Sequence, residues 1–153
     1  MHGRTTPPRG FTLVELIVTL GVLGVIASVG ALVWPQIEAA LRLEAGIHQL
    51  AADLRTTRGR AIAAAARTRI VFVRGSAAYR VEAADDDDAF QALTERRLPG
   101  GIRVSDANSG GDLVFTARGN AENGTVVLVD RRGRHASLRL NQRGRVTIDR
   151  GRT

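Results

Sequence analysis

Residues that could carry out acid–base or nucleophilic chemistry are sparse in this 153-residue chain, which has three histidines and no cysteine. Without cysteine there are no disulfides and no thiolate metal sites. Asp130, His135 and Ser137 lie close together in the sequence, but a strand would supply neither a nucleophile turn nor an oxyanion site beside them. His48 fits a partly buried structural histidine better than a ligand. We therefore expect no enzyme activity, no cofactor and no histidine-based metal site.

Four consecutive carboxylates, Asp85–Asp88, are the next group with chemical potential. Calcium is the natural cation for such oxygen ligands. The run lacks the alternating ligand spacing and the glycine of a calcium loop, so a solvated loop is the favoured interpretation. Cation binding and contact with a basic partner remain alternatives.

Positive charge gathers near the end of the chain. The sequence has 22 basic and 15 acidic residues, and every basic residue is an arginine. Residues 125–153 hold eight of these arginines against only Asp130 and Asp149. Such a face can serve nucleic acid, anionic lipid or an acidic protein partner, and net charge does not choose among them. No aromatic residue follows Phe115, which argues against base-specific recognition of single strands.

Glu15 is the only charged residue in an apolar segment that runs from Phe11 to Trp34. As a helix this segment would extend roughly 36 Å, enough to cross a hydrocarbon core of about 30 Å. Arg4 and Arg9 precede it, which predicts that this end stays in the cytoplasm and that the remainder is exported. A carboxylate inside a bilayer costs about 3 kcal/mol, so Glu15 requires a partner.

The elements that must carry these residues can be read from periodicity. Pro35 predicts a kink or local break. A helix with one apolar stripe should follow to about Arg67; the stripe comprises Ile37, Leu41, Leu43, Ile47, Leu50, Leu54 and Ile62.

Beyond Arg67 the apolar period shortens toward two, which predicts strands separated by glycine-containing turns. The expected strands are 70–73, 79–82, 93–98, 102–104, 113–115, 125–129, 136–140 and 146–148. One long helix followed by short strands predicts an α+β fold, with antiparallel sheet packed on the helix.

The stretch Arg9-Gly10-Phe11-Thr12-Leu13-Val14-Glu15-Leu16 resembles the type III signal of type IV pilins and pseudopilins. The resemblance implies that prepilin peptidase cuts between Gly10 and Phe11 and that Phe11 is N-methylated. It also implies that Glu15 pairs with the amino terminus of a neighbouring subunit during assembly with other major and minor pilins or pseudopilins.

A second resemblance involves Leu50-x-x-Asp53-Leu54-x-x-x-Arg58-x-x-Ala61-Ile62, then Phe115-x-x-x-Gly119, Gly124-Thr125-Val126, Gly133 and Gly144-Arg145-Val146. This pattern is similar to the minor pseudopilin group that includes GspH of type II secretion and FimT of type IV pili. It implies a leader at 1–10, a transmembrane helix at 11–34, an amphipathic helix at 35–67 and a periplasmic head at 68–153.

Two functions follow from the resemblance. The first is that of a minor pseudopilin, anchored in the inner membrane, in a short periplasmic filament that assists protein export. The alternative is a FimT-like minor pilin that binds DNA or aids pilus assembly. DNA binding would use Arg143, Arg145, Arg150 and Arg152, although Thr147 stands where the FimT motif Gly-Arg-x-Arg has its second arginine.

Overall fold

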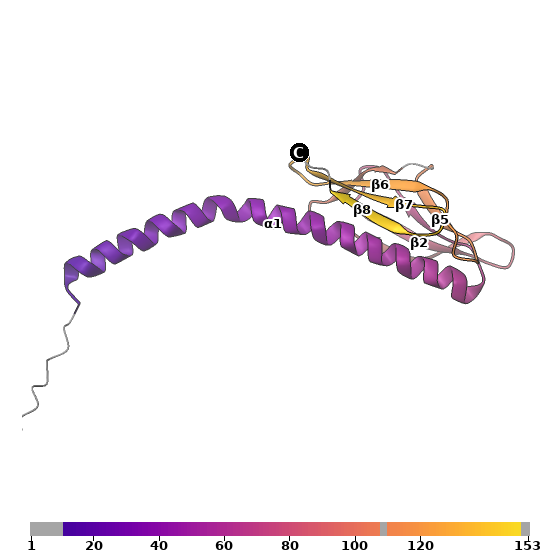
Figure 1. Cartoon of the computed structure of the whole chain (residues 1–153), viewed down its shortest axis with the longest axis horizontal. Helices are drawn as coiled ribbons and strands as arrows, with labels where there is room; N and C mark the ends of the chain where they lie inside the picture. Colours follow the sequence, from indigo (N-terminus) through magenta and orange to yellow (C-terminus); the bar gives the residue numbers. More distant parts are fainter. Residues whose placement is uncertain (1–10, 108–109, 151–153) are drawn as a thin grey trace, which may run out of the picture. The chain divides into compact units, whose positions relative to one another are not determined.

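A computed structural model describes residues 11–107 and 110–150 as one helix, α1 (Leu13–Ala64), followed by eight strands (Figure 1). The strands are β1 (Thr68–Phe72), β2 (Ala78–Ala84), β3 (Phe90–Arg97), β4 (Arg103–Ala107), β5 (Asp112–Phe115), β6 (Gly124–Val129), β7 (His135–Leu140) and β8 (Val146–Arg150). The chain divides into two compact units, 1–38 and 39–153; the second unit is called the head below. The expected α+β class is confirmed.

The helix α1 is continuous through Pro35, so the local break considered from the sequence is absent. The helix ends where Ala65 adopts a positive φ of 51°. There the amide of Ala66 donates to the carbonyl of Ala61 and the amide of Ala65 donates to that of Ile62. This left-handed ending caps the final carbonyls and turns the chain into β1.

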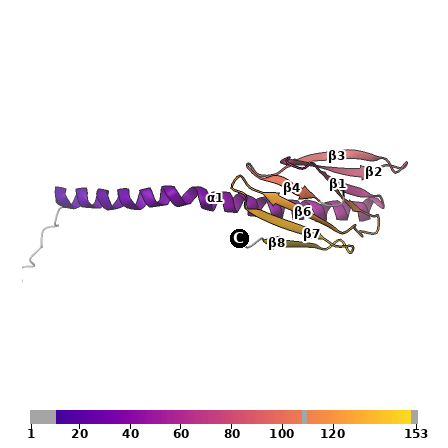
Figure 2. The ribbon, with the colours of Figure 1, turned by 90° about the horizontal axis from the view of Figure 1, so that it is seen from above.

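The strands form two antiparallel four-stranded sheets. They lie on one side of the head's part of α1 in Figure 1 and extend across it in the view of Figure 2. The first sheet has the order β3-β2-β1-β5 and the second the order β4-β6-β7-β8. Backbone bonds join the two sheets at the β1–β2 turn, because Gly75 donates to the Val104 carbonyl and Val104 donates to the Ser76 carbonyl. β3, β5, β4 and β8 are left as edge strands.

The expected apolar stripe of the helix is correct in its middle and wrong at its ends. The side chains of Leu43, Ile47, Leu50 and Leu54 are buried. By contrast, three predicted members, Ile37, Leu41 and Ile62, are about half exposed or more. Helical periodicity continues in the sequence beyond the length of helix that the sheets cover.

The hydrophobic core lies entirely within the head. All of its buried apolar side chains fall between Leu43 and Leu140. They come from the inner face of α1 and from alternate positions of the strands, as in β1, where Ile70 and Phe72 are buried and Arg69 and Val71 less so. The prediction that His48 is partly buried is wrong, because its side chain is 54% exposed; it lies 3.5 Å from Glu44.

Candidate functional site

The N-terminal turn of α1 is organised by Thr12. Its hydroxyl Oγ1 accepts a hydrogen bond from the backbone amide of Glu15 at 3.2 Å, and its carbonyl accepts one from Leu16. Thr12 is therefore the N-cap and Glu15 the third helical residue, as in a capping box. This places the carboxylate in the first turn, where the helix dipole favours negative charge.

Glu15 stands out along an otherwise apolar helix. Residues 13–64 include a segment with a mean hydropathy of 2.6, long and apolar enough to span a membrane, and none of that segment is buried within the chain. From residue 11 onward the first basic residue is Arg42. Among the described residues, no cation pairs with Glu15. Any positive group that pairs with this carboxylate would have to come from outside the described residues. Gly10 lies outside the described residues, and Phe11, the first one described, is exposed.

In the head, Asp53 of α1 is bonded to the first sheet. The buried Tyr79 donates its hydroxyl hydrogen to Asp53 at 2.6 Å, and Gln49 donates to the Tyr79 oxygen at 3.2 Å and to the Arg97 carbonyl at 2.9 Å. Burial, and then the bond to Asp53, raise the pKa of Tyr79 well above its usual range. Asp53, which belongs to the sequence pattern that begins at Leu50, therefore has a structural role: it joins α1 to the first sheet.

Arg58 of α1 plays the corresponding part for the second sheet. Its Nε donates to the carbonyl of Gly119 at 2.8 Å. A Cβ on Gly144 would lie only 2.5 Å from the same Nε. The guanidinium therefore fits between two glycine-containing loops, 116–120 and 141–145. We call this part of the head, with those loops and Arg58, the Arg58 end.

Three tight turns of the head share one design, a polar residue followed by x-Arg-Gly-x. They are Thr116–Asn120, Asp130–Arg134 and Asn141–Arg145. In each, the glycine has a positive φ and donates to the carbonyl of the first residue, and the first residue donates to the carbonyl of the last. Such three-residue connections with a bulged glycine suit antiparallel strands. The predicted glycine turns are confirmed, but their shared design was missed.

Asp130 begins the second of these turns and is buried. Its carboxylate accepts bonds from the amides of Arg132 and Arg134 and from the Arg134 guanidinium, at 2.7 to 2.9 Å. Burial alone would raise the pKa of Asp130, but these bonds outweigh it and hold the pKa below its ordinary value. Asp130 therefore shapes the β6–β7 turn, while His135 is exposed at the start of β7.

The candidate DNA-binding arginines are not gathered in one place. Arg143 and Arg145 lie in the β7–β8 turn at the Arg58 end, whereas Arg150 closes β8 at its other end, five residues away. At roughly 3.3 Å per residue this separates the backbone positions of Arg145 and Arg150 by about 17 Å. Arg152 lies outside the described residues.

The loop that carries Asp85–Asp88 has its own internal bonds. Asp85 accepts bonds from the amides of Asp87 and Ala89, and the bond from Ala89 is the main cause that lowers the pKa of Asp85. Asp88 pairs with Arg67 at 2.7 Å. Across residues 11–107 and 110–150, no group of three or more potential ligands has the geometry to hold a metal ion. Two of the four carboxylates are thus engaged within the chain, Asp85 by amides of its own loop and Asp88 by Arg67.

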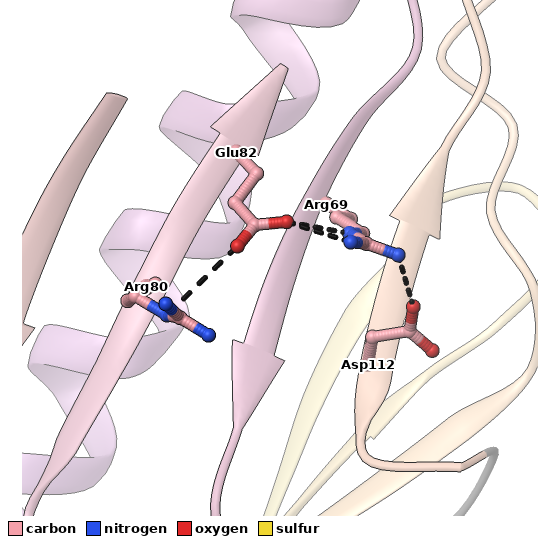
Figure 3. A network of polar contacts seen from close by, with 4 residues as sticks. All are labelled: Arg69, Arg80, Glu82 and Asp112. Atoms are coloured by element: carbon pink, nitrogen blue, oxygen red, sulfur yellow. Dashed lines mark hydrogen bonds and ion pairs between the residues drawn. The ribbon is translucent and has the colours of Figure 1, made fainter. Parts of the chain in front are cut away.

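Sequence reasoning also missed a charged network on the first sheet (Figure 3). Arg69 of β1 contacts Glu82 of β2 at 2.8 Å and Asp112 of β5 at 3.3 Å, and Arg80 lies 3.8 Å from Glu82. The Arg69 guanidinium also lies 4.0 Å from the centre of the Phe90 ring. The network ties three neighbouring strands together, and Arg69 opposite Glu82 in the hairpin register was the available signal.

Two known family models match this chain. A family model described as "Type II transport protein GspH" matches residues 47–149, more than half of the chain. This chain belongs to the GspH family. A second model, the prokaryotic N-terminal methylation motif, matches residues 7–31. The two matches confirm both resemblances seen in the sequence.

Solved structures show that this GspH-family chain has the pilin-like fold. The minor pseudopilin EpsH of Vibrio cholerae is 11% identical with a TM-score of 0.61, covering 71% of this chain and 97% of its own. GspH of E. coli is 12% identical with a TM-score of 0.62, covering 73% and 90%. The type IV minor pilin FimU of Pseudomonas aeruginosa is 16% identical with a TM-score of 0.57, covering 70% and 87%. No curated protein sequence matches significantly.

Proposed function

We propose that this chain is a minor pseudopilin of a type II secretion system. Prepilin peptidase cuts between Gly10 and Phe11, Phe11 is N-methylated, and the apolar part of α1 anchors the subunit in the inner membrane with the head in the periplasm. The subunit then joins a short filament with other pseudopilins and assists protein export. The observation that carries the proposal is the match of the GspH family model over residues 47–149.

Glu15 supports the assembly step. The Thr12 cap holds the backbone amide of Glu15 in the first turn of α1, and among the described residues no cation pairs with its carboxylate. Cleavage after Gly10 creates a new ammonium group at Phe11, four residues before Glu15. In a dry environment such a pair gains far more than in water. The neighbouring subunit's amino terminus is therefore the partner that we propose for Glu15.

The test replaces Glu15 by glutamine and by alanine in cells that carry the secretion system. Both variants should be inserted and trimmed normally but should fail to co-purify with the other pseudopilins. Glu44→Ala, a change of the same charge in the head's part of α1, is the control and should assemble. Normal assembly of Glu15→Ala would refute the role of Glu15.

Processing is tested separately. Gly10→Leu should leave the leader attached, which intact mass measurement would detect as a heavier membrane-bound form. A precursor of this variant that is still trimmed before Phe11 would contradict the proposed cleavage site.

A minor type IV pilin is the second candidate, because the likeness to FimU is close in extent to the likeness to EpsH. In its DNA-binding form, Arg143, Arg145, Arg150 and Arg152 would contact phosphates. A salt series with duplex DNA tests this, comparing Arg143→Gln/Arg145→Gln with Arg150→Gln/Arg152→Gln. If the four arginines form one stripe along the phosphates, DNA affinity should fall steeply with salt and should drop in both double variants.

A further inference from the structure

A shallow groove with arginines in its lining crosses the Arg58 end of the head. It consists of two adjoining concavities of about 400 Å³ and 530 Å³, which share Asn123 and lie between loop 120–123 and turn 141–145. Arg139, Arg145 and Thr147 line the first concavity. The second is lined by Arg143, Gln142 and the carboxylate of Glu122, among others. The assembly residues of the N-terminal segment take no part in this groove.

Two exposed arginines, Arg139 and Arg145, line the first concavity. Arg139 of β7 stands opposite Thr147 of β8, and Arg145 lies two residues before Thr147, so both arginines fall on one face as diagonal neighbours. Within the described chain, neither guanidinium forms an ion pair. Among the described residues, neither Glu122, which lines the second concavity, nor Asp149 of β8 forms an ion pair with these arginines. Two unneutralised like charges at this spacing repel each other, and an anion placed between them would relieve the repulsion.

The walls of the groove are held in place before any ligand arrives. Arg58 bonds to the Gly119 carbonyl at 2.8 Å, and the Ala121 amide donates to the Gln142 carbonyl at 2.9 Å, which joins the two walls. In the turn itself, Asn141 Oδ1 accepts bonds from the amides of Arg143 and Arg145. A preorganised site loses less entropy when it binds.

β8 is an edge strand of the second sheet, and its Thr147 lines the first concavity. An edge strand presents unpaired backbone groups, to which an extended peptide can add as a further strand. The arginines are confined to one end of β8, with Arg150 about 17 Å away, whereas a duplex needs a longer stripe of phosphate contacts. We propose that this groove binds an acidic, extended peptide segment of a partner protein, with carboxylates on Arg139 and Arg145.

The inference does not depend on the filament role, because it concerns the head surface alone. The test uses the full-length protein in a nonionic detergent at low salt and measures fluorescence anisotropy. The probe is a labelled hexapeptide of four aspartates flanked by alanines, and its control has asparagines instead. Inorganic phosphate and a short DNA duplex serve as competitors.

The decisive comparison is between two variants with the same loss of charge. Arg139→Gln/Arg145→Gln alters the groove, whereas Arg131→Gln/Arg132→Gln alters two exposed arginines in the β6–β7 turn at the opposite end of the same sheet. We expect the aspartate peptide to bind, the asparagine peptide not to bind, and affinity to fall about tenfold in the groove variant only.

Four outcomes would overturn the proposal. Equal losses in the two variants would show bulk charge attraction, and absence of binding in the wild type would show that the groove is not a peptide site. Displacement by millimolar phosphate as effective as by unlabelled peptide would indicate a simple anion site. DNA that binds more tightly than the peptide, and loses affinity in the same groove variant, would transfer the groove to the DNA-binding function.

Discussion

Gly144 and Gly133 occupy the same position in two turns of the same design, with φ values of 71° and 80°. Their surroundings differ. A Cβ on Gly133 would meet nothing within 4 Å, whereas a Cβ on Gly144 would lie 2.5 Å from Arg58 Nε and 2.7 Å from the Gly119 carbonyl oxygen. Both glycines adopt a left-handed backbone, but of the two only Gly144 leaves no room for an added Cβ.

This pair gives a controlled prediction. Gly133→Ala should destabilise the head by about 1 to 2 kcal/mol through left-handed backbone strain. Gly144→Ala should cost at least about 1 kcal/mol more, because Arg58 and the facing loop must move. Urea unfolding followed by pulse proteolysis measures both. Equal losses in the two variants would contradict the clamp between Arg58 and the glycine loops.

Asp130 provides a prediction with a pH dependence. Its folded-state pKa is depressed, so its charge stabilises the head above the unfolded value of about 3.9, and that contribution is lost as the pH falls through the folded pKa. Asp130→Asn should therefore cost about 1 to 3 kcal/mol at neutral pH.

The difference in the free energy of unfolding between Asp130→Asn and the wild type should then shrink in acid. The same urea titration, repeated from neutral to strongly acidic pH, follows this narrowing. A gap that stayed constant down to pH values below the folded pKa would show that the charge of Asp130 does not stabilise the turn.

At the level of single residues, the sequence was informative where chemistry is local. Glu15 is conspicuous because nothing else in its segment is charged, and its place in the first helical turn follows from the Thr12 cap. The grouping of Arg139 with Arg145 was not visible in the same way. It depends on the β7–β8 register, which sets Arg139 opposite Thr147, and no local signal specifies that register beyond the turn glycine.

Among the elements, every predicted strand is present, with ends shifted by a few residues. Glycine turns and alternating apolar residues were sufficient for that, because both are local signals. The division into two sheets was not predictable in this way. β5 pairs with β1, with β2, β3 and β4 between them in the chain, and turn chemistry reports only on neighbouring strands.

Arg58 lies between the loops 116–120 and 141–145. Its replacement should therefore change hydrogen exchange mainly at these two loops. In Arg58→Met, the amides of loops 116–121 and 141–145 should exchange hydrogen faster, because the guanidinium no longer holds the Gly119 carbonyl. The amides of turn 130–134 should be unaffected. Hydrogen exchange with mass spectrometry resolves these segments.

Arg55→Met and Arg60→Met are the matched controls, since both arginines are exposed on the same helix. Faster exchange at the two loops in either control, or none in Arg58→Met, would remove Arg58 from its proposed position between the loops.

For the molecule as a whole, the two halves of α1 differ in what their apolar residues contact. The residues of the apolar half bury nothing within the chain, whereas the half in the head supplies Leu43, Ile47, Leu50 and Leu54 to the core. The sequence indicated both halves through composition and period, but the point where burial begins depends on where the sheets lie. Ile37 and Leu41 continue the apolar pattern without being covered, which explains the error at that end.

This division predicts that a fragment of residues 39–153 folds without the membrane segment. It contains every buried side chain of the core, and it keeps the head's part of α1, whose apolar face the sheets cover. We expect cooperative urea unfolding with strong circular dichroism from both helix and strand. A fragment that begins at residue 68 should fail, because the core would lose Leu43, Ile47, Leu50 and Leu54 of the helix. If the shorter fragment unfolded as cooperatively as the longer one, the helix would not be part of the head's core.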